Sequence, residues 1–591
     1  MLVNYRTDLL VRNNKLYTNR SYELLINNRK GEEYAEVSIP YSKMNKVSKV
    51  EAFIKDKNGN VVKNLKPGDI EERSMMADFS FYEDNFVKEF TLVHNVYPYT
   101  LCYKFQQQED AFFYIDNWTP IINRDIPTIN ATLTLDVPRD YKIAFSQQFV
   151  DNFEVDTLEK SIKYMWKGSY SKQITPEIYA PEISCLKPMV RIVPDKFKYD
   201  QEGMNSSWKT YGNWEYRLIE GLNELPENEK RQIDDLIEGV KNDNEKVKIL
   251  YHYLQDETRY INISIETGGM KPYPATYVAI NKYGDCKALS NYFKSVLSYV
   301  GIPSFYTNVY AGDLIKNIDL NFPSMQFNHV ILCVPFPKDT LWLDCTSNGP
   351  FNYLGTFTQN RDAFLISSAN STFIRTPALL KQDVLEIRKV HINSDSLSGA
   401  ISNFRNTYKG KNYENLFSLS SLTSESKTSQ VIRNNFIEND FDLINYKLMP
   451  VHRDSASIVL NYTAKADKLF RKYGKDMLIR IIPFSIPAFK EPKIRKCPVQ
   501  IDYPLYKIDT LEYQLPLGYS LSNSFKNQTI NSVFGTYAIE FQLHENTVKV
   551  VKSFLLNAGR YSLGQYADFY NFIKTVSDID YNSYIVTRKK E

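Results

Sequence analysis

A cysteine stands at the predicted start of an amphipathic helix, where its chemistry would be that of a nucleophile. Cys286 follows Gly284 and Asp285, and the apolar residues after it have the spacing of one helical face: Leu289, Phe293, Val296, Leu297 and Val300. Gly301 and Pro303 favour the end of this helix. The partial positive charge of a helix N-terminus stabilises a thiolate, which is the reactive form of cysteine. Most cysteines are small buried hydrophobic residues, so the position alone does not establish a nucleophile.

A histidine and an aspartate follow on two predicted strands. His329 lies in an apolar run over 326–334 that predicts a buried strand, and Asp344 lies in a second run over 341–346. The segment between these runs has the composition of a turn. The two runs therefore predict a hairpin with His329 and Asp344 on neighbouring strands. The type of turn is not specified by the sequence, so the register of the pairing stays open.

Together the three residues supply what thiol chemistry needs. A cysteine nucleophile requires a base beside its sulfur and a carboxylate that orients the imidazole of that base. Each residue alone also has a structural explanation: Cys286 as a buried thiol, His329 as a core histidine with its hydrogen bonds satisfied, and Asp344 as the cap of a turn. Their coincidence in one segment favours catalysis, because packing does not demand these three residue types together.

Three short stretches carry a resemblance to a known family. Tyr283 to Lys287, Phe327 to Val330 and Trp342 to Asp344 resemble the core of the transglutaminase-like superfamily, a branch of the papain-like cysteine enzymes. The upstream stretch from Arg259 through Gly268-Gly269 to Ala275 looks like the segment that precedes the cysteine in bacterial members. The resemblance covers residues 230–360, and it implies a papain-like core in this part of the chain.

The resemblance implies a role for each of the three residues. Cys286 would be the nucleophile, His329 the general base and acid, and Asp344 the orienting carboxylate. The backbone N–H of Cys286 would be one oxyanion donor, and three residues are candidates for the second by position only: Gln255, Asn281 and Tyr283. Bacterial relatives often carry an acidic residue where this chain has Ala288, which predicts a difference in how the helix start is held.

The reaction implied is acyl transfer from a peptide or protein substrate. Water as the acceptor makes a protease or amidase, and a lysine amine makes a crosslinking enzyme; hydrolysis is favoured in bacteria. No cofactor and no metal is implied. A second interpretation is a catalytically idle scaffold on the same fold, whose large β domains bind protein or glycan partners at a surface.

Composition describes a globular chain of several domains. The 591 residues are 43% hydrophobic and 24% charged, and 72 basic residues against 69 acidic ones give a net charge of +3. This near balance lacks the excess of basic residues that is typical of a protein that binds nucleic acid.

No apolar run is long enough to span a membrane. The N-terminus lacks a hydrophobic signal core, yet the resemblance implies an exported protein, periplasmic or at the cell surface, whose signal was removed. A cytoplasmic protein is the alternative.

The six cysteines show neither Cys-x-x-Cys spacing nor paired histidines, so zinc is not expected. Cys333 and Cys345 come near each other across the predicted hairpin. We expect both to be reduced core residues, because opposed strand positions are seldom well placed for a disulfide.

The hydrophobic period predicts a multidomain α+β protein. Residues 1–224 read as an N-terminal β-sandwich-like domain, and 225–370 as the transglutaminase-like core. The polar composition of segment 211–228 predicts an exposed linker between the N-terminal domain and the core. Residues 371–497 read as a β-rich region with a helical segment over 412–438. Residues 498–591 read as a small C-terminal β domain with a late helix over 563–576.

Overall fold

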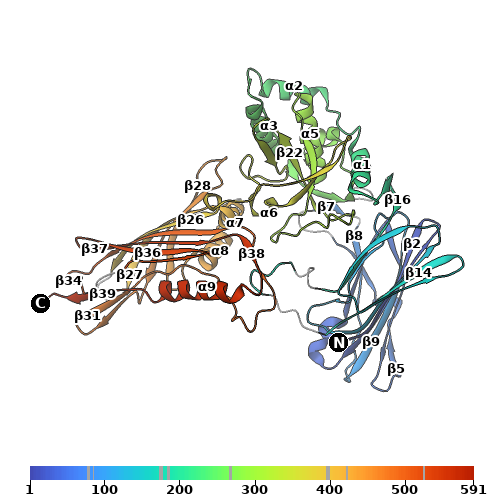
Figure 1. Ribbon diagram of the computed structural model, residues 1–591, viewed down its shortest axis with the longest axis horizontal. Coiled ribbons are helices and arrows are strands. Elements are labelled where there is room, and N and C mark those ends of the chain that lie inside the picture. Colours follow the sequence, from blue (N-terminus) through green and yellow to red (C-terminus); the bar gives the residue numbers. More distant parts are fainter. Residues whose placement is uncertain are drawn as a thin grey trace.

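Three parts of the chain follow one another in Figure 1: a β domain at the N-terminus (blue), a mixed core (green to yellow) and a β domain with helices at the C-terminus (orange to red). The computed structural model describes residues 1–75, 80–83, 85–171, 177–182, 187–264, 269–394, 399–420, 424–522 and 526–590. Across these residues, no helix is both long and apolar enough to cross a membrane. The predicted multidomain α+β architecture is confirmed.

The N-terminal domain is built on a sheet of eight strands. In spatial order they are β13 (Asn152–Thr157), β14 (Ser161–Tyr170), β11 (Thr128–Pro138), β1 (Leu2–Arg12), β2 (Lys15–Ile26), β9 (Tyr99–Glu109), β4 (Asn45–Lys55) and β5 (Val61–Asn64). Along β11 the alternating side chains of Leu133, Leu135 and Val137 are fully buried. The alternation therefore places one face of the sheet against a core.

Two three-stranded sheets complete this domain. One is β3 (Glu36–Ser42), β8 (Asn85–Thr91) and β6 (Glu71–Ser74), and the other is β10 (Asp116–Trp118), β15 (Met189–Pro194) and β12 (Ile143–Gln148). Ile39, Phe90 and Ile192 from these sheets share one apolar cluster with Leu133 of the large sheet. A hairpin of β16 (Lys196–Tyr199) and β17 (Gln201–Met204) leads from this domain to the core.

The core contains a five-stranded sheet with helices packed against it. The strands, in spatial order, are β23 (Thr340–Leu343), β22 (His329–Pro335), β21 (Phe305–Val309), β24 (Asp362–Leu365) and β25 (Thr372–Arg375). The helices are α1 (Trp208–Ile219), α2 (Glu227–Leu236), α3 (Asp243–Glu257), α4 (Ala275–Asn281), α5 (Cys286–Tyr299) and α6 (Gly355–Thr358). The apolar face of α5 packs on β22 and β23, where Leu289 and Phe293 share a cluster with Leu332 and Leu343. This face is the one that the spacing predicts.

Helix α1 replaces the predicted linker at 211–228, so that prediction is wrong for residues 211–219. Tyr211 and Trp214 of α1 are fully buried and lie in one cluster with Tyr306 of β21 and Phe364 of β24. A Cβ on Gly212 would lie 2.4 Å from the side chain of Ser371. The glycine therefore permits close packing of the helix rather than a flexible turn. The core begins before residue 225, at α1.

The C-terminal domain is a second eight-stranded sheet. Its strands, in spatial order, are β28 (Asp442–Pro450), β29 (Ile458–Ala466), β27 (Ala400–Tyr408), β26 (Leu385–Ser394), β33 (Leu505–Gln514), β37 (Thr547–Leu556), β36 (Gly535–His544) and β35 (Gln528–Ser532). Strands β26 and β33 pair in parallel. The predicted division at residue 498 therefore falls inside one sheet, and 371–497 and 498–591 do not form separate sheets.

Smaller elements flank this sheet. A four-stranded sheet contains β30 (Phe470–Tyr473), β31 (Asp476–Arg480), β39 (Tyr584–Lys589) and β34 (Tyr519–Leu521), and β32 (Val499–Ile501) pairs with β38 (Gly559–Tyr561). The predicted helical segment is the pair α7 (Gly410–Ser420) and α8 (Glu425–Phe436), and the late helix is α9 (Tyr566–Tyr581). In Figure 1, α9 runs along the strands of this domain.

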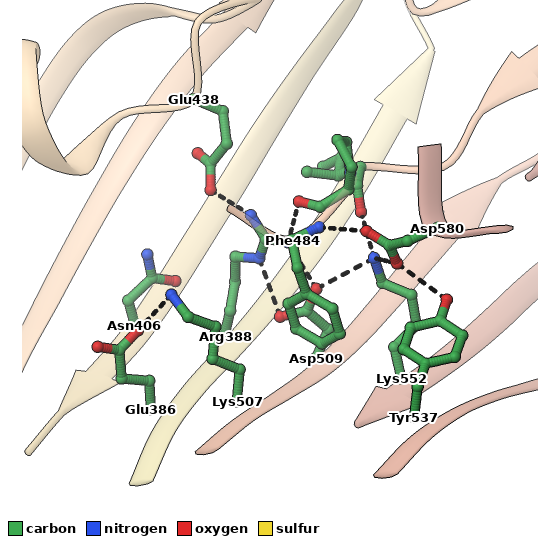
Figure 2. A network of polar contacts seen from close by, with 12 residues as sticks. Glu386, Arg388, Asn406, Glu438, Phe484, Lys507, Asp509, Tyr537, Lys552 and Asp580 are labelled. Atoms are coloured by element: carbon green, nitrogen blue, oxygen red, sulfur yellow. Dashed lines mark hydrogen bonds and ion pairs between the residues drawn. The ribbon is translucent and has the colours of Figure 1, made fainter. Parts of the chain in front are cut away.

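A buried network of charges lies inside the C-terminal domain (Figure 2). Lys552 is fully buried, and its Nζ donates to Asp580 Oδ1 and to the Ile482 carbonyl, each at 2.7 Å. Asp509 accepts from Arg388 Nε at 3.0 Å. Because each of these buried charges has an opposite partner, the network ties β26, β33 and β37 to α9.

Contacts between the parts fix their arrangement. Arg191 of β15 binds Asp319 Oδ2 of the core at 2.5 Å, and Arg453 of the C-terminal domain binds Asp256 of α3 at 2.7 Å. The Gln500 N–H donates to the Tyr179 carbonyl at 2.7 Å, so the chain after the N-terminal sheet also reaches the C-terminal domain. In addition, β7 (Ser80–Glu83) pairs in parallel with β19 (Asn262–Ser264).

Candidate active site

Helix α5 begins at Cys286, as the sequence predicts. Asp285 is its N-cap residue, and Asp285 Oδ1 accepts a hydrogen bond from the Ala288 N–H at 2.8 Å. Ala288 is fully buried, and a Cβ on Gly284 would lie 2.8 Å from the Ala288 Cβ. The space at position 288 therefore suits a small side chain, which gives a packing reason for the alanine at this point of the helix.

The strands that flank His329 are fixed by their neighbours. Asn328, which precedes the histidine, donates from Nδ2 to the Ala311 carbonyl at 2.9 Å and accepts from the Ala311 N–H at 2.7 Å. The backbone of His329 pairs with Val309 of β21. Ser290 of α5 donates to the Val330 carbonyl at 3.3 Å. The helix that begins at Cys286 and the strand that begins at His329 are therefore joined directly.

His329 and Asp344 meet at the open end of the hairpin. His329 Nε2 lies 2.9 Å from Asp344 Oδ2. The paired residues of β22 and β23 run from Pro335–Thr340 to Leu332–Leu343, and Asp344 directly follows β23. The predicted hairpin is therefore present, and it brings Asp344 to the histidine. Cys333 and Cys345 of the same hairpin are buried free thiols, as predicted.

The carboxylate of Asp344 is held on its other side as well. Its Oδ1 accepts from the Thr346 N–H at 3.0 Å and from Thr346 Oγ1 at 2.7 Å. The hydroxyl group of Tyr251 in α3 donates a hydrogen bond to the backbone carbonyl of Asp344 at 2.9 Å. Both oxygens of the carboxylate thus have donors, and the orientation of Oδ2 toward the imidazole is fixed.

Burial and charge act in opposite directions on the imidazole. Burial lowers the pKa of His329, but the Asp344 carboxylate and hydrogen bonds to Asp344 and Cys286 raise that pKa to about 10. Burial also opposes ionisation of Asp344, yet the imidazole and Thr346 hold the pKa of that carboxyl below its ordinary value. At neutral pH the pair is therefore an imidazolium with a carboxylate. Nε2 faces Asp344, which leaves Nδ1 for the side of Cys286.

Two further side chains complete the surroundings of Cys286 and His329. Lys287, next to the cysteine, forms an ion pair with Asp285. Burial lowers the pKa of Lys287, but its interactions with Asp285 and Cys286 outweigh burial and raise this pKa above its ordinary value. The ring of Phe357 lies edge-to-face against the His329 imidazole, with 5.5 Å between centroids. Neither contact was predicted; that of Phe357 with His329 depends on how α6 packs against β22, which the sequence does not specify.

The three candidates for a second oxyanion donor are placed elsewhere. Gln255 Nε2 donates to the carbonyls of Ser347 and Gly349, at 2.9 and 2.8 Å. Asn281 donates to the carbonyl of Tyr277, and Tyr277 donates to the hydroxyl of Tyr283. None of the three lines the cavity beside Cys286. Two residues named in the sequence analysis, Gly268 and Cys185, lie outside the described residues.

A cavity of about 70 Å³ opens beside Cys286 and His329. Its walls come from α1, α5, β21, β22 with the segment before it, and residues 269–270. Apolar side chains line much of the cavity, and Lys287, Asn308 and Asn328 add polar groups. The cavity also contains a carboxyl group, that of Glu215. The sequence did not single out this glutamate, and its position within an unpredicted helix explains why.

Comparisons with known proteins agree with this architecture. A domain of unknown function, DUF3857, matches residues 12–173, and a second, DUF3858, matches residues 476–586. No curated protein matches the chain.

Among solved structures, a "putative protease" from Parabacteroides distasonis is 15% identical, covers 99% of both chains and gives a TM-score of 0.67. A "putative cysteine protease" from Cytophaga hutchinsonii is 9% identical, over 63% of this chain and 87% of that one, with a TM-score of 0.18. Only the first of these two is similar over the whole fold. The chain therefore shares the fold of the first of these proteins along its whole length, with the DUF3857 match before the core and the DUF3858 match after it.

Proposed function

We propose that the chain is a thiol-dependent acyl-transfer enzyme that acts on peptide or amide bonds, with hydrolysis favoured over crosslinking. The observation that carries this proposal is the contact of His329 Nε2 with Asp344 Oδ2 at 2.9 Å, beside a cysteine in the first turn of a helix. The printed name of the solved structure that shares this fold, "putative protease", supports the same class of reaction.

The proposed reaction begins at the sulfur. The Cys286 thiolate attacks the carbonyl carbon of the substrate and a tetrahedral oxyanion forms. The Cys286 N–H, which lies in the first turn and has no acceptor within the helix, is placed to stabilise this oxyanion. When the C–N bond breaks, the His329 imidazolium gives its proton to the leaving amine and a thioester remains. Asp344 keeps the imidazole in position throughout.

The second half of the reaction restores the enzyme. Neutral His329 takes a proton from water, and the resulting oxygen nucleophile attacks the thioester carbonyl. The C–S bond then breaks, the acid is released and the thiolate with its imidazolium is regenerated. A positioned histidine contributes about 10²–10⁴-fold to the rate of such steps.

Substitution of the cysteine tests the proposal. Cys286→Ala should abolish hydrolysis of a peptide mixture and change the free energy of unfolding by only about 1 kcal/mol or less, because one sulfur is lost at a helix start. A large loss of stability with unchanged hydrolysis would make Cys286 a packing residue. The proposal implies a peptide or protein substrate. Export of the protein, and contacts of its β domains with glycans or surface proteins, stay predictions from the sequence.

A further inference from the structure

A buried glutamate, Glu215, lines the cavity beside Cys286. Glu215 is 6% exposed, and it projects from α1 into the space lined also by Cys286 and His329. Its Oε2 accepts a hydrogen bond from Asn308 Nδ2 of β21 at 2.6 Å, and Tyr211 forms a second hydrogen bond with the carboxyl. Lys287 and His329 also line this cavity, but each is paired with another carboxylate, Lys287 with Asp285 and His329 with Asp344. Within the described part of the chain, no lysine, arginine or histidine forms an ion pair with Glu215.

The surroundings of Glu215 oppose ionisation of its carboxyl group. Burial raises the pKa of Glu215 to about 8, although Asn308 and Tyr211 oppose the shift. A buried acid without a counter-ion is uncommon, because its charged form loses hydration that nothing replaces. Buried carboxyls elsewhere in this chain are paired: Asp580 with Lys552, and Glu229 with Lys282. With a pKa of about 8, most of the Glu215 carboxyl is protonated at neutral pH, and a cation that arrives with a ligand would stabilise its ionised form.

The walls of the cavity specify the rest of that ligand. Leu218 and Ile219 of α1, Met270, Met325 and Phe327 are apolar and surround the space in front of the carboxyl. A cavity of about 70 Å³ admits a narrow group rather than a ring system or a folded segment. A chain of methylene groups would bury its surface against these walls and would carry its terminal charge to Glu215.

We propose that this cavity is a substrate subsite for a primary amine on an unbranched apolar stem, such as a lysine side chain close to the carbonyl that Cys286 attacks, and that Glu215 binds the amine. The inference rests on the proposed function, because the same cavity is lined by the nucleophile and its base. Bound there, the ammonium would donate to Glu215, and Asn308 would continue to hold the other side of the carboxyl.

Paired covalent probes test the subsite in the full-length protein. Peptidyl acyloxymethyl ketones that carry lysine at the first or the second residue from the reactive group are compared with norleucine counterparts, which lack only the amine. The rate of labelling of Cys286 is measured by intact mass. In the unaltered chain, one lysine probe should react about tenfold or more faster than its norleucine counterpart, as expected for a desolvated charge pair. Glu215→Gln should bring this ratio close to one.

A matched control separates the cavity from the helix that carries it. Glu220→Gln changes an exposed acid at the end of the same helix, and the lysine preference should persist in that variant. If Glu215→Gln does not fold, the ratio in the unaltered chain decides alone. Equal or slower labelling by the lysine probes, or labelling of Cys286 by iodoacetamide but by no peptide probe, overturns the subsite. Absence of labelling by every reagent overturns the proposed function instead.

Discussion

His329 Nε2 and Asp344 Oδ2 lie 2.9 Å apart at the open end of a hairpin, and this contact orients the imidazole toward Cys286. Two local features produce it. The pairing of β22 with β23 places the end of one strand beside the start of the other, and Thr346 occupies the remaining oxygen of the carboxylate. The geometry thus arises from a short stretch of chain that is held between α3, α5 and β21.

Asp344→Asn should reduce the alkylation rate of Cys286 at neutral pH, but less than His329→Ala does. The carboxylate orients and charges the imidazole without handling the reacting proton, so its loss leaves a base in place. Iodoacetamide labelling followed by mass spectrometry measures both rates. Asp339→Asn is the matched control, since this residue lies in the turn of the same hairpin. If the Asp339 variant is slowed and the Asp344 variant is not, the assignment of the carboxylate is wrong.

The raised pKa of His329 predicts a particular pH dependence of stability. In the unfolded chain the imidazole has an ordinary pKa of about 6.5, and in the folded chain the value is about 10. Stabilisation from the imidazolium is therefore complete below about pH 6.5 and is lost as the pH rises through 10. The difference in free energy of unfolding between the unaltered chain and Asp344→Asn should shrink over this range. Urea unfolding at several pH values measures the difference, and a constant value would contradict the shift.

The N-terminal domain should influence the reactivity of Cys286. Arg191 binds Asp319, which accepts from and donates to Gln326 in the segment just before His329. Arg191→Ala should displace this segment and slow alkylation of Cys286, by up to about 10²-fold if the base moves by an ångström. Arg73→Ala, which removes an exposed pair in the same domain, should have no effect. Equal rates in all three proteins would show that the interface does not position the histidine.

The charge network of Figure 2 should be essential for the stability of the C-terminal domain. Lys552→Met removes the cation from the buried carboxylate of Asp580 and should cost about 3–5 kcal/mol because this charge loses its partner, whereas Asp509 keeps Arg388. Lys574→Met breaks an exposed pair on α9 and should cause no measurable loss, which makes it the control. Denaturant unfolding compares the two variants. Similar midpoints for both would mean that the buried network relaxes without the lysine.

Local patterns predicted the helix and the hairpin that carry the proposed triad. The helix at Cys286 has a regular apolar period and a glycine at its end, and Gly301 indeed has a positive φ of 78°. The hairpin needs only neighbouring strands and a short turn.

Non-local packing explains the features that the sequence did not reveal. Helix α1 presents Gly212 and Glu215 on its buried side, where a regular apolar stripe would carry hydrophobic residues, so its pattern resembles a linker. The parallel pairing of β26 with β33 joins segments that are far apart in the chain, and short strands do not specify such partners. The subsite with Glu215 depends on both α1 and β21, and it emerges only when the two are packed together.

The pH dependence of Cys286 alkylation tests the central claim most directly. Iodoacetamide labelling of the full-length protein and of His329→Ala is followed by mass spectrometry between about pH 5 and pH 9, a range that contains the ordinary thiol pKa of about 8.5. A thiolate paired with an imidazolium should react at a nearly constant rate well below that value, and His329→Ala should react slowly until the pH approaches it. If both proteins instead show the same rise near the ordinary thiol value, Cys286 is not an activated nucleophile and the proposed enzyme is ruled out.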